Sequence, residues 1–180
     1  MKTMDKQEQI DALELKSLYE KVLALFDVSD AEKLGEALMH CVETNDASTY
    51  DSFYELTDGD LTKDWLQMIY QYYCADRKDK KQDYTPKCLA QFLSRLIGES
   101  AETIDMCAGS GAVTIQRWIE NPDTVFTLYE IDENVIPYLL FNMAIRNISA
   151  TVHQSDILQN ETVKSWSIRK GDRFGKVSCI

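Results

Sequence analysis

Segment 103–116, TIDMCAGSGAVTIQ, constrains the fold of this chain more than any other stretch. A short apolar run ends near Asp105, an Ala-Gly-Ser-Gly turn follows, and apolar residues then recur at helical spacing. The pattern predicts a strand, a glycine loop (residues 106–111) and a helix. Many folds hold a nucleotide-like ligand in this way, because the free amides of the helix N-terminus point at the ligand.

The sequence around this segment continues to alternate between strand and helix patterns. Strands are expected at 103–107, 124–129, about 151–154 and 176–180, and helices at about 111–120 and 133–147. Such alternation predicts a parallel sheet of right-handed βαβ units with helices on both faces.

A further helix is expected just before the first strand. Thr85 supplies a cap, Pro86 suits the first helical position, and Gly98 ends the helix. Its expected apolar face consists of Leu89, Phe92, Leu93, Leu96 and Ile97.

The first part of the chain has only helical patterns. Apolar residues follow helical spacing at Ile10, Leu13, Leu18, Val22 and Leu25, and again at Leu34, Ala37, Leu38, Cys41 and Val42. Ser29 and Glu32 fit a capping box for the second of these helices. Ser48 is a candidate cap for a short helix that ends at Leu56, residues 57–60 form a turn, and a last helix is expected at 61–73.

Charge divides the chain in the same way. The protein carries a net charge of −11, and residues 1–75 hold 16 of its acidic side chains against 6 basic ones. This acidic helical region (residues 1–75) should repel a phosphate backbone. The polar, charged stretch 76–83 is the expected boundary, either a solvated connector or a basic loop near a polyanion.

Composition excludes several classes of protein. No apolar run reaches the roughly 18 residues that a membrane span needs, and residues 1–16 lack the apolar core of a signal peptide; we therefore expect a cytoplasmic protein. The five cysteines form no CxxC pair, so neither a disulfide framework nor a zinc site is expected, and each thiol is interpreted as buried. With only two histidines, no histidine-based metal centre is expected.

Two carboxylates narrow the choice of ligand for the glycine loop. Glu130 ends the second expected strand, where an acid accepts the hydroxyl protons of a ribose in NAD, FAD or S-adenosylmethionine alike. The complete GxGxxG fingerprint fails at Thr114. Asp105 would repel a pyrophosphate but attract an ammonium or sulfonium group, which favours S-adenosylmethionine over a dinucleotide.

A third carboxylate has two interpretations. Asp156 follows the third expected strand, and Ile157 and Leu158 come next. It is either a contact for an exocyclic amine such as adenine N6 or a plain helix cap, and the residues favour neither.

Four segments in order carry a resemblance to a known family: DYTP (83–86), DMCAGSGA (105–112), YEIDENVIPYLLFNMAIRN (129–147) and SDIL (155–158). The chain resembles the N6-adenine DNA methyltransferases, close to the modification subunits of type I restriction–modification systems, over about residues 80–180. This implies an α/β class I methyltransferase fold, a Rossmann-like parallel sheet, that binds S-adenosylmethionine in residues 76–180 behind the acidic helical region.

The resemblance also implies roles for individual residues. Tyr84 and Thr85 would border the methionine end of the cofactor, and Asp105, Gly109, Ser110 and Gly111 would form the cofactor turn. Glu130 would hold the ribose, Ile131 would pack on the adenine, and Asp156 would meet the adenine amine. Cys107 is interpreted as a packing residue and not as a nucleophile, so no catalytic residue and no metal ligand is assigned.

The catalytic element of that family, an Asn-Pro-Pro-aromatic tetrapeptide after the fourth strand, does not occur in this sequence. The sequence ends at KVSCI, which we expect to be the fourth strand, beside the first and with an unpaired edge. We therefore expect an incomplete sheet, a homodimer or hetero-oligomer, DNA contact through missing regions or a partner subunit, and no methyl transfer by this chain alone.

Three functions remain open at this point. The first is a short member of the adenine methyltransferase family that holds the cofactor half. The second is a non-catalytic module that binds S-adenosylmethionine or a protein partner, and the third is a methyltransferase for another substrate.

Overall fold

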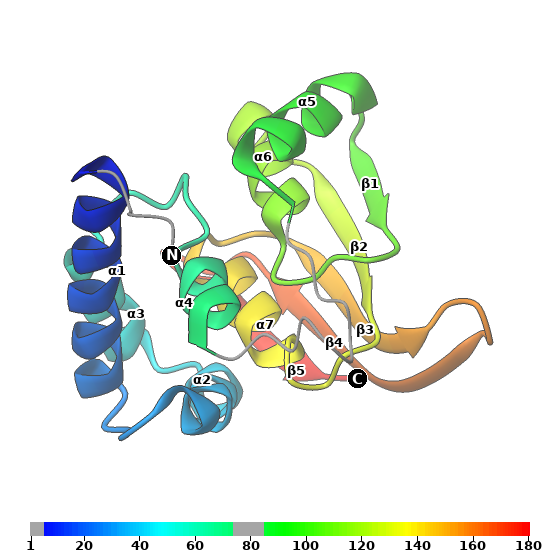
Figure 1. The fold of residues 1–180 in the computed structure, drawn as a ribbon. Helices are drawn as coiled ribbons and strands as arrows, with labels where there is room; N and C mark the ends of the chain where they lie inside the picture. Colours follow the sequence, from blue (N-terminus) through cyan, green and yellow to red (C-terminus); the bar gives the residue numbers. More distant parts are fainter. Residues whose placement is uncertain (1–5, 74–84) are drawn as a thin grey trace.

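The computed structural model of the chain describes residues 6–73 and 85–180. The described helices are α1 (Lys6–Leu25), α2 (Ala31–Thr44), α3 (Ala47–Leu56), α4 (Trp65–Tyr73), α5 (Lys87–Ile97), α6 (Ala112–Glu120) and α7 (Ile136–Ile145). The described strands are β1 (Glu102–Asp105), β2 (Val125–Glu130), β3 (Ala150–Asp156), β4 (Glu161–Arg169) and β5 (Lys176–Cys179) (Figure 1). The expected boundary at 76–83 lies outside the described residues.

The helical character of the first part is confirmed, but the predicted caps are wrong. Asp30 caps α2 by accepting from the Lys33 amide at 3.2 Å, while the Ser29 hydroxyl donates to Asp30 at 2.7 Å. Asp46, and not Ser48, caps α3. A carboxylate occupies the N-cap of both α2 and α3. An ionised acceptor binds the free amides of a helix N-terminus more strongly than a hydroxyl does.

Five strands form one sheet in the order β1-β2-β3-β4-β5. β1, β2 and β3 run parallel, with Asp105 beside Leu128 and Glu130 beside Gln154. β4 is antiparallel to β3, and β5 is antiparallel to β4. The mixed α/β class and the parallel start of the sheet agree with the expected methyltransferase fold.

The predicted position of the last strand is wrong, and β4 was not predicted at all. β5 lies beside β4, at the edge of the sheet opposite β1. The reason is the length of the connections: residues 157–160 separate β3 from β4, and residues 170–175 separate β4 from β5. A parallel crossover needs a dozen or more residues, so both connections form hairpins.

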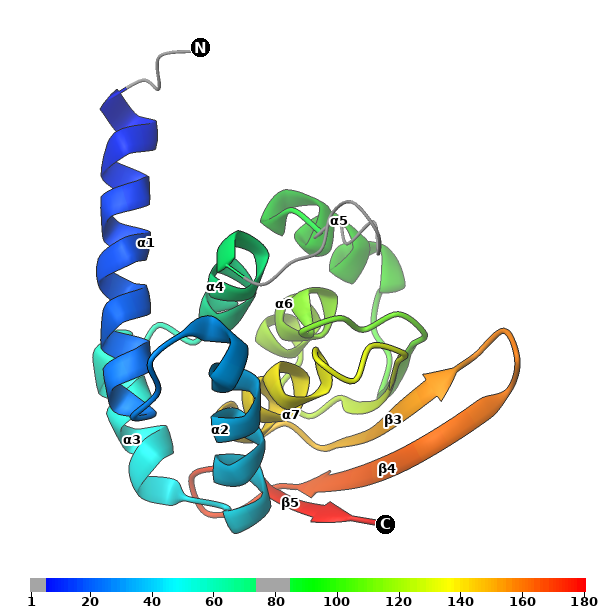
Figure 2. The ribbon, with the colours of Figure 1, turned by 60° about the horizontal axis from the view of Figure 1, so that its bottom comes forward.

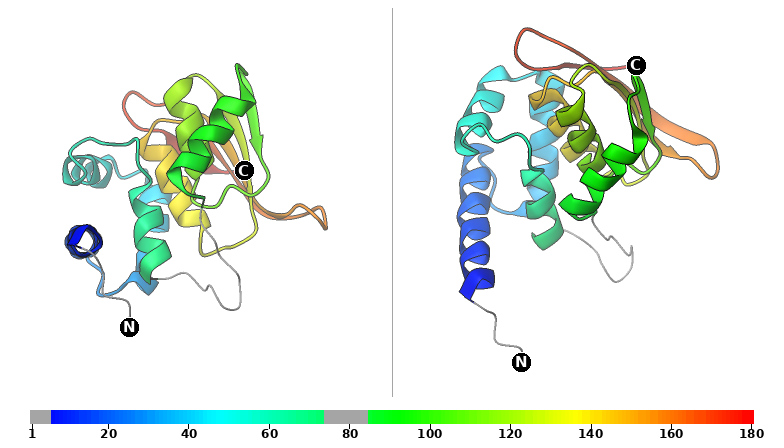
Figure 3. Two further views of the ribbon diagram at one scale, coloured as in Figure 1. Left: turned by 45° about the horizontal axis from the view of Figure 1, so that its top comes forward. Right: turned by 90° about the horizontal axis from the view of Figure 1, so that it is seen from above.

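The described helices cover one face of the sheet and not both, which corrects the sequence-based expectation. α5, α6 and α7 lie on the same side of the strands (Figures 1 and 3). Phe126, Leu128 and Val152 point to that side and are buried. The alternate residues Thr127 and His153 are only partly covered. Apolar and polar residues alternate along these strands, as in sheets with one solvated face.

Helix α7 is the centre of the core. All ten of its residues are buried, and its sequence, IPYLLFNMAI, is apolar on nearly every side. The sheet lies against one side of α7, and α2 packs on another (Figure 2). Phe141 contacts the rings of Phe26, Tyr50 and Phe53 at centroid distances of 5.1 to 5.7 Å. The acidic helical region therefore shares its core with the sheet.

The apolar face of α5 does not join this core. The helix begins at Lys87, with Pro86 as its cap and no side-chain cap from Thr85, and it ends at Gly98 as predicted. Ala90 and Ser94 are buried, whereas Phe92 is 60% and Leu96 is 71% exposed. The amphipathic pattern predicted the helix correctly but not which surface covers it.

Among the described residues, no helix is long and apolar enough to cross a membrane.

Candidate functional site

The carboxyl ends of the three parallel strands meet at one edge of the sheet and carry the three predicted acids. Asp105 ends β1, Glu130 ends β2, and Asp156 ends β3. In an open parallel sheet, ligands bind at this edge. The topology therefore brings Asp105 and Glu130 to neighbouring strand ends on either side of the glycine loop.

The glycine loop leaves β1 and enters α6 in a conformation that only its two glycines favour. The Ala108 amide donates to the Tyr129 carbonyl at 2.9 Å, and the Gly111 amide donates to the Ala108 carbonyl at 2.8 Å. Gly109 has φ +55° and Gly111 has φ +100°, both in the left-handed region that glycine tolerates best.

The two glycines face different surroundings. Apart from its chain neighbours, no atom of the described residues lies within 4 Å of the position that a Cβ on Gly109 would take, so these residues leave that side of the loop open. A Cβ on Gly111 would lie 2.7 Å from Met143 Cε and 3.2 Å from Leu139 Cδ1. Gly111 therefore permits close packing of the loop on α7, and Gly109 is the glycine that leaves room for a ligand.

Glu130 closes the loop from the neighbouring strand. The Gly109 amide donates to Glu130 Oε2 at 2.8 Å, and the Asp132 amide donates to Oε1 at 2.8 Å. Each oxygen keeps a second lone pair for a further donor. Glu130 is thus fixed in place beside the open side of Gly109.

Asp105 is less well satisfied than Glu130. Its Oδ1 accepts from the Cys107 amide at 3.2 Å. Burial raises the pKa of Asp105 above its ordinary value, opposed only by that amide, and no cation of the described residues lowers it. A partly buried carboxylate without a cation gains most from a positively charged ligand.

Cys107 does not pack in the core, which corrects the predicted role. The residue is exposed. The pKa of its thiol is nevertheless raised, by partial burial of the sulfur and by the negative charges of Asp105 and Glu130. A thiol between two carboxylates stays protonated and is a poor nucleophile. Of the other described cysteines, Cys41 is buried while Cys88 and Cys179 are exposed, so the prediction of buried thiols is confirmed only for Cys41; Cys74 lies outside the described residues.

Two more predicted residues lie near the loop. Ile131 follows Glu130 and is 61% exposed, so its apolar surface is available to a flat ring. Thr85 lines a cavity of about 370 Å³ together with Asp64 and Ala112, the first residue of α6. Tyr84 lies outside the described residues.

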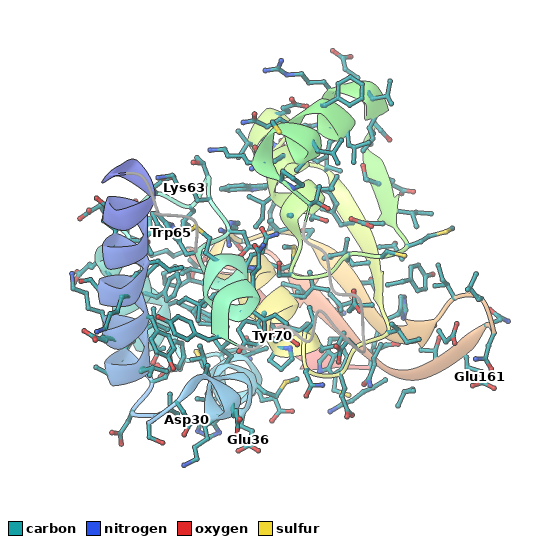
Figure 4. All side chains as sticks on the ribbon, viewed as in Figure 1. Asp30, Glu36, Lys63, Trp65, Tyr70 and Glu161 are labelled. Atoms are coloured by element: carbon teal, nitrogen blue, oxygen red, sulfur yellow. The ribbon has the colours of Figure 1, made fainter. Side chains whose placement is uncertain are left out.

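Asp156 does not cap a helix, which corrects one of its two predicted roles; its contact with an adenine amine stays a prediction. Its Oδ1 accepts from the amides of Leu158 and Gln159 at 2.9 and 3.2 Å, and its Oδ2 accepts from Gln159 Nε2 at 2.8 Å. It therefore caps the β3–β4 hairpin turn and no helix. Asp156 pairs with Glu161, which lies at the projecting end of the hairpin, away from the helices (Figure 4).

Sequence reasoning missed three residues that support the loop: Asp64, Asn142 and Arg146. Asp64 accepts from the Ser110 hydroxyl at 2.6 Å, and Asn142 Nδ2 donates to both the Ser110 carbonyl and Asp64 at 2.9 Å. Asp64 was missed because the predicted helix began at residue 61 and so placed Asp64 inside it, whereas α4 begins at Trp65, directly after Asp64. An aspartate directly before the true helix start was the available signal.

The arrangement offers two carboxylates, an open glycine and an exposed apolar residue within one loop cluster. This donor set suits a ligand with a cationic group, hydroxyls and an aromatic ring. Among the described residues, no group of three or more His, Cys, Asp or Glu side chains is placed to hold a metal ion.

Comparison with known proteins gives one significant match. A sequence model for N-6 DNA methylases matches residues 58–177, two thirds of the chain. No curated protein and no solved structure gives a significant match.

Proposed function

Because this chain belongs to the N-6 DNA methylase family, we propose that its glycine loop binds S-adenosylmethionine for adenine-N6 methylation of DNA, in a restriction–modification system. The observation that carries the proposal is the pair of carboxylates around Gly109. Glu130 is held to the Gly109 amide at 2.8 Å, and Asp105 lies across the loop without a cationic partner among the residues that the structure describes.

The residues match the groups of S-adenosylmethionine one by one. Asp105 attracts the positive charge of the ammonium and sulfonium groups, which a dinucleotide lacks. Glu130 accepts from the ribose hydroxyls, and Ile131 packs on the adenine ring. Bound in this way, the cofactor would present an electrophilic methyl group on its sulfonium.

Other assignments rest on the resemblance alone. Tyr84 and Thr85 would border the methionine end, and Thr85 lines the same cavity as Ala112, the first residue of α6. Asp156 would have to exchange its hairpin hydrogen bonds for one from the adenine amine. It is the weakest of the proposed ligand contacts, because both of its oxygens already accept from the turn.

Recognition of the target base needs residues beyond the cofactor loop. Methylation of a base requires that it leave the duplex and stack in a pocket near the methyl group. No Asn-Pro-Pro-aromatic tetrapeptide occurs in this sequence. We propose that a partner subunit or another segment supplies the DNA contact, and that this chain alone transfers no methyl group to duplex DNA.

A second function is a non-catalytic module that binds S-adenosylmethionine or a protein partner. The exposed apolar face of α5 favours it, since Phe92 and Leu96 leave a large apolar surface on a charged protein. The two proposals differ in the DNA step and share the cofactor loop.

Calorimetric titration tests the ligand. We expect S-adenosylmethionine to bind and NAD to bind far more weakly. Asp105→Ala and Glu130→Ala should each weaken binding at least tenfold, because each leaves ligand donors or charges unpaired. Asp123→Ala is the matched control. Asp123 is an exposed carboxylate in the loop before β2, and it forms an ion pair with Lys170.

Binding of NAD but not S-adenosylmethionine would refute the proposal. Unchanged affinity in both carboxylate variants would refute the site, even if the cofactor binds. Incorporation of a labelled methyl group into duplex DNA by this chain alone would refute the proposal that a partner subunit or another segment is needed for methyl transfer.

A further inference from the structure

Asp64 connects the acidic helical region to the glycine loop through a short contact. The residue lies between Leu61 and Trp65, in the turn before α4, and is 46 residues away from Ser110 in sequence. Its Oδ2 accepts from the Ser110 hydroxyl at 2.6 Å, and its Oδ1 accepts from the Gln67 amide at 2.9 Å. One carboxylate thus caps α4 and holds the middle of the glycine loop.

Asn142 on α7 completes the contact with the loop. Its Nδ2 donates to Asp64 Oδ1 and to the Ser110 carbonyl, both at 2.9 Å. Ser110 is therefore held by its side chain and by its backbone. It lies between Gly109 and Gly111, the two residues with the greatest conformational freedom in the loop.

Arg146 fixes the turn that carries Asp64. The guanidinium is buried, and it donates to the carbonyls of Leu61 and Lys63 at 2.9 and 2.7 Å. It also donates to Asn142 Oδ1 at 2.8 Å. Asn142 thus links a buried cation to the carboxylate of Asp64, which lowers the cost of keeping both away from water.

The Asp64 carboxylate is the acceptor in each of its contacts. Ser110, Asn142 and the Gln67 amide all donate to it, and an ionised carboxylate is an acceptor only. An asparagine would keep an oxygen for the Gln67 amide and Asn142, but its NH₂ group would face the Ser110 hydroxyl, which would then have to accept instead of donate. The exchange of one oxygen for an NH₂ group therefore removes the charge-assisted hydrogen bond from Ser110 and reverses its direction, without a change of size.

We propose that Asp64 is a positioning residue that fixes the glycine loop for the methionine end of S-adenosylmethionine. This rests on the proposed function. Asp64 and Thr85 line the same cavity of about 370 Å³, which reaches the first residue of α6. The acidic helical region then belongs to the cofactor site and is not a separate attachment.

A pair of ligands separates positioning from general support. S-adenosylhomocysteine and 5′-methylthioadenosine share the adenosine and the sulfur, but only the first carries the amino acid. Asp64→Asn should weaken S-adenosylhomocysteine at least tenfold and 5′-methylthioadenosine less than about threefold. Only the first ligand has the amino-acid group that the glycine loop would hold, and Glu130 keeps its anchor to the Asp132 amide outside the loop. A residue that merely stabilised the fold would affect both ligands equally.

Asp46→Asn is the matched control. Asp46 caps the neighbouring helix α3 through the amides of Ser48 and Thr49, without any contact to the glycine loop. It should leave both affinities unchanged. Ser110→Ala removes the hydrogen bond between Ser110 and Asp64 from the side of the loop. It should show the same selective loss, and it replaces Asp64→Asn in the test if that variant does not fold.

The outcomes are distinct. Equal losses for the two ligands, or wild-type affinity for S-adenosylhomocysteine in folded Asp64→Asn and Ser110→Ala, would overturn the positioning role. If the wild-type protein binds neither ligand, the proposed function fails. Hydrogen exchange at the Gly109 and Gly111 amides then decides whether Asp64 holds the loop, because Asp64→Asn and not Asp46→Asn should accelerate it at least tenfold.

Discussion

At the scale of single residues, Asp105 and Glu130 are prepared for a ligand to different degrees. Glu130 already accepts two backbone amides at 2.8 Å, whereas Asp105 has one amide at 3.2 Å and a raised pKa. A bound cation would change the surroundings of Asp105 more than those of Glu130. Asp105 is therefore the residue through which the charge of a ligand is recognised.

This difference predicts a pH dependence of binding. Burial raises the pKa of Asp105 in the folded free protein above its unfolded value. The contribution of this group to folding stability is therefore fully present below the unfolded pKa, where the carboxyl is neutral, and is lost as the pH rises through the folded pKa. A cation favours the ionised form. Affinity for S-adenosylmethionine should therefore fall as the pH falls from about 7 toward about 4.

Titration of wild-type protein and Asp105→Asn over this range checks the prediction. The variant should bind more weakly at pH 7 and lose most of the pH dependence. Parallel pH profiles for the two proteins would show that another group is responsible.

At the scale of elements, two phenylalanines that both belong to apolar patterns, Phe92 in a helix and Phe126 in a strand, differ in burial. Phe126 on β2 is fully buried, and Phe92 on α5 is 60% exposed. Both lie in amphipathic patterns that predict burial. Phe126 is buried because it lies on the face of the sheet that the helices cover (Figure 1), while Phe92 lies on the solvent-exposed face of α5.

Alanine substitutions measure this difference. Phe126→Ala should lower the free energy of unfolding by about 3–5 kcal/mol, because it leaves a cavity in the core. Phe92→Ala should change it by no more than about 0.5 kcal/mol, as at other surface positions. Urea denaturation of both variants checks the prediction, and a large loss in Phe92→Ala would show that the α5 face is covered in solution.

At the scale of the whole molecule, β1 and β5 are edge strands, and no described strand pairs with their outer sides. Beside the β1 edge, Ile104 is 63% exposed and lies near the apolar face of α5 across a cavity of about 300 Å³. Thr103, Thr114 and Arg117 line the same cavity, and each has a buried polar atom without a hydrogen-bond partner among the described residues. Open edges, apolar surface and unsatisfied polar atoms together favour association.

We therefore expect the isolated chain to self-associate at tens of micromolar. Leu96→Glu, on the exposed α5 face, should shift the protein toward monomer in sedimentation velocity. Leu158→Glu is the control, because Leu158 is 93% exposed on the β3–β4 hairpin, away from this surface. A wild-type monomer at these concentrations would contradict the expectation.

Much of the fold could be predicted from local patterns. The strand, glycine loop and helix from β1 to α6 lie within two residues of their expected bounds, and so does β2. The helix caps were predicted less well, and β4 was not predicted. ETVKSWSIR has too weak an alternation to identify a strand before its partner β3 is known.

The sequence by itself determined the glycine loop, the acids at the ends of β1 and β2, and the family, since these depend on residues close together in the chain. Only the tertiary structure decided the strand order, the single covered face of the sheet and the contact of Asp64 with Ser110. These arise from residues that are distant in sequence and meet only when α7 packs between the helices and the sheet. Local hydrogen bonding fixes a loop's shape, but the shared core determines which distant side chain holds it.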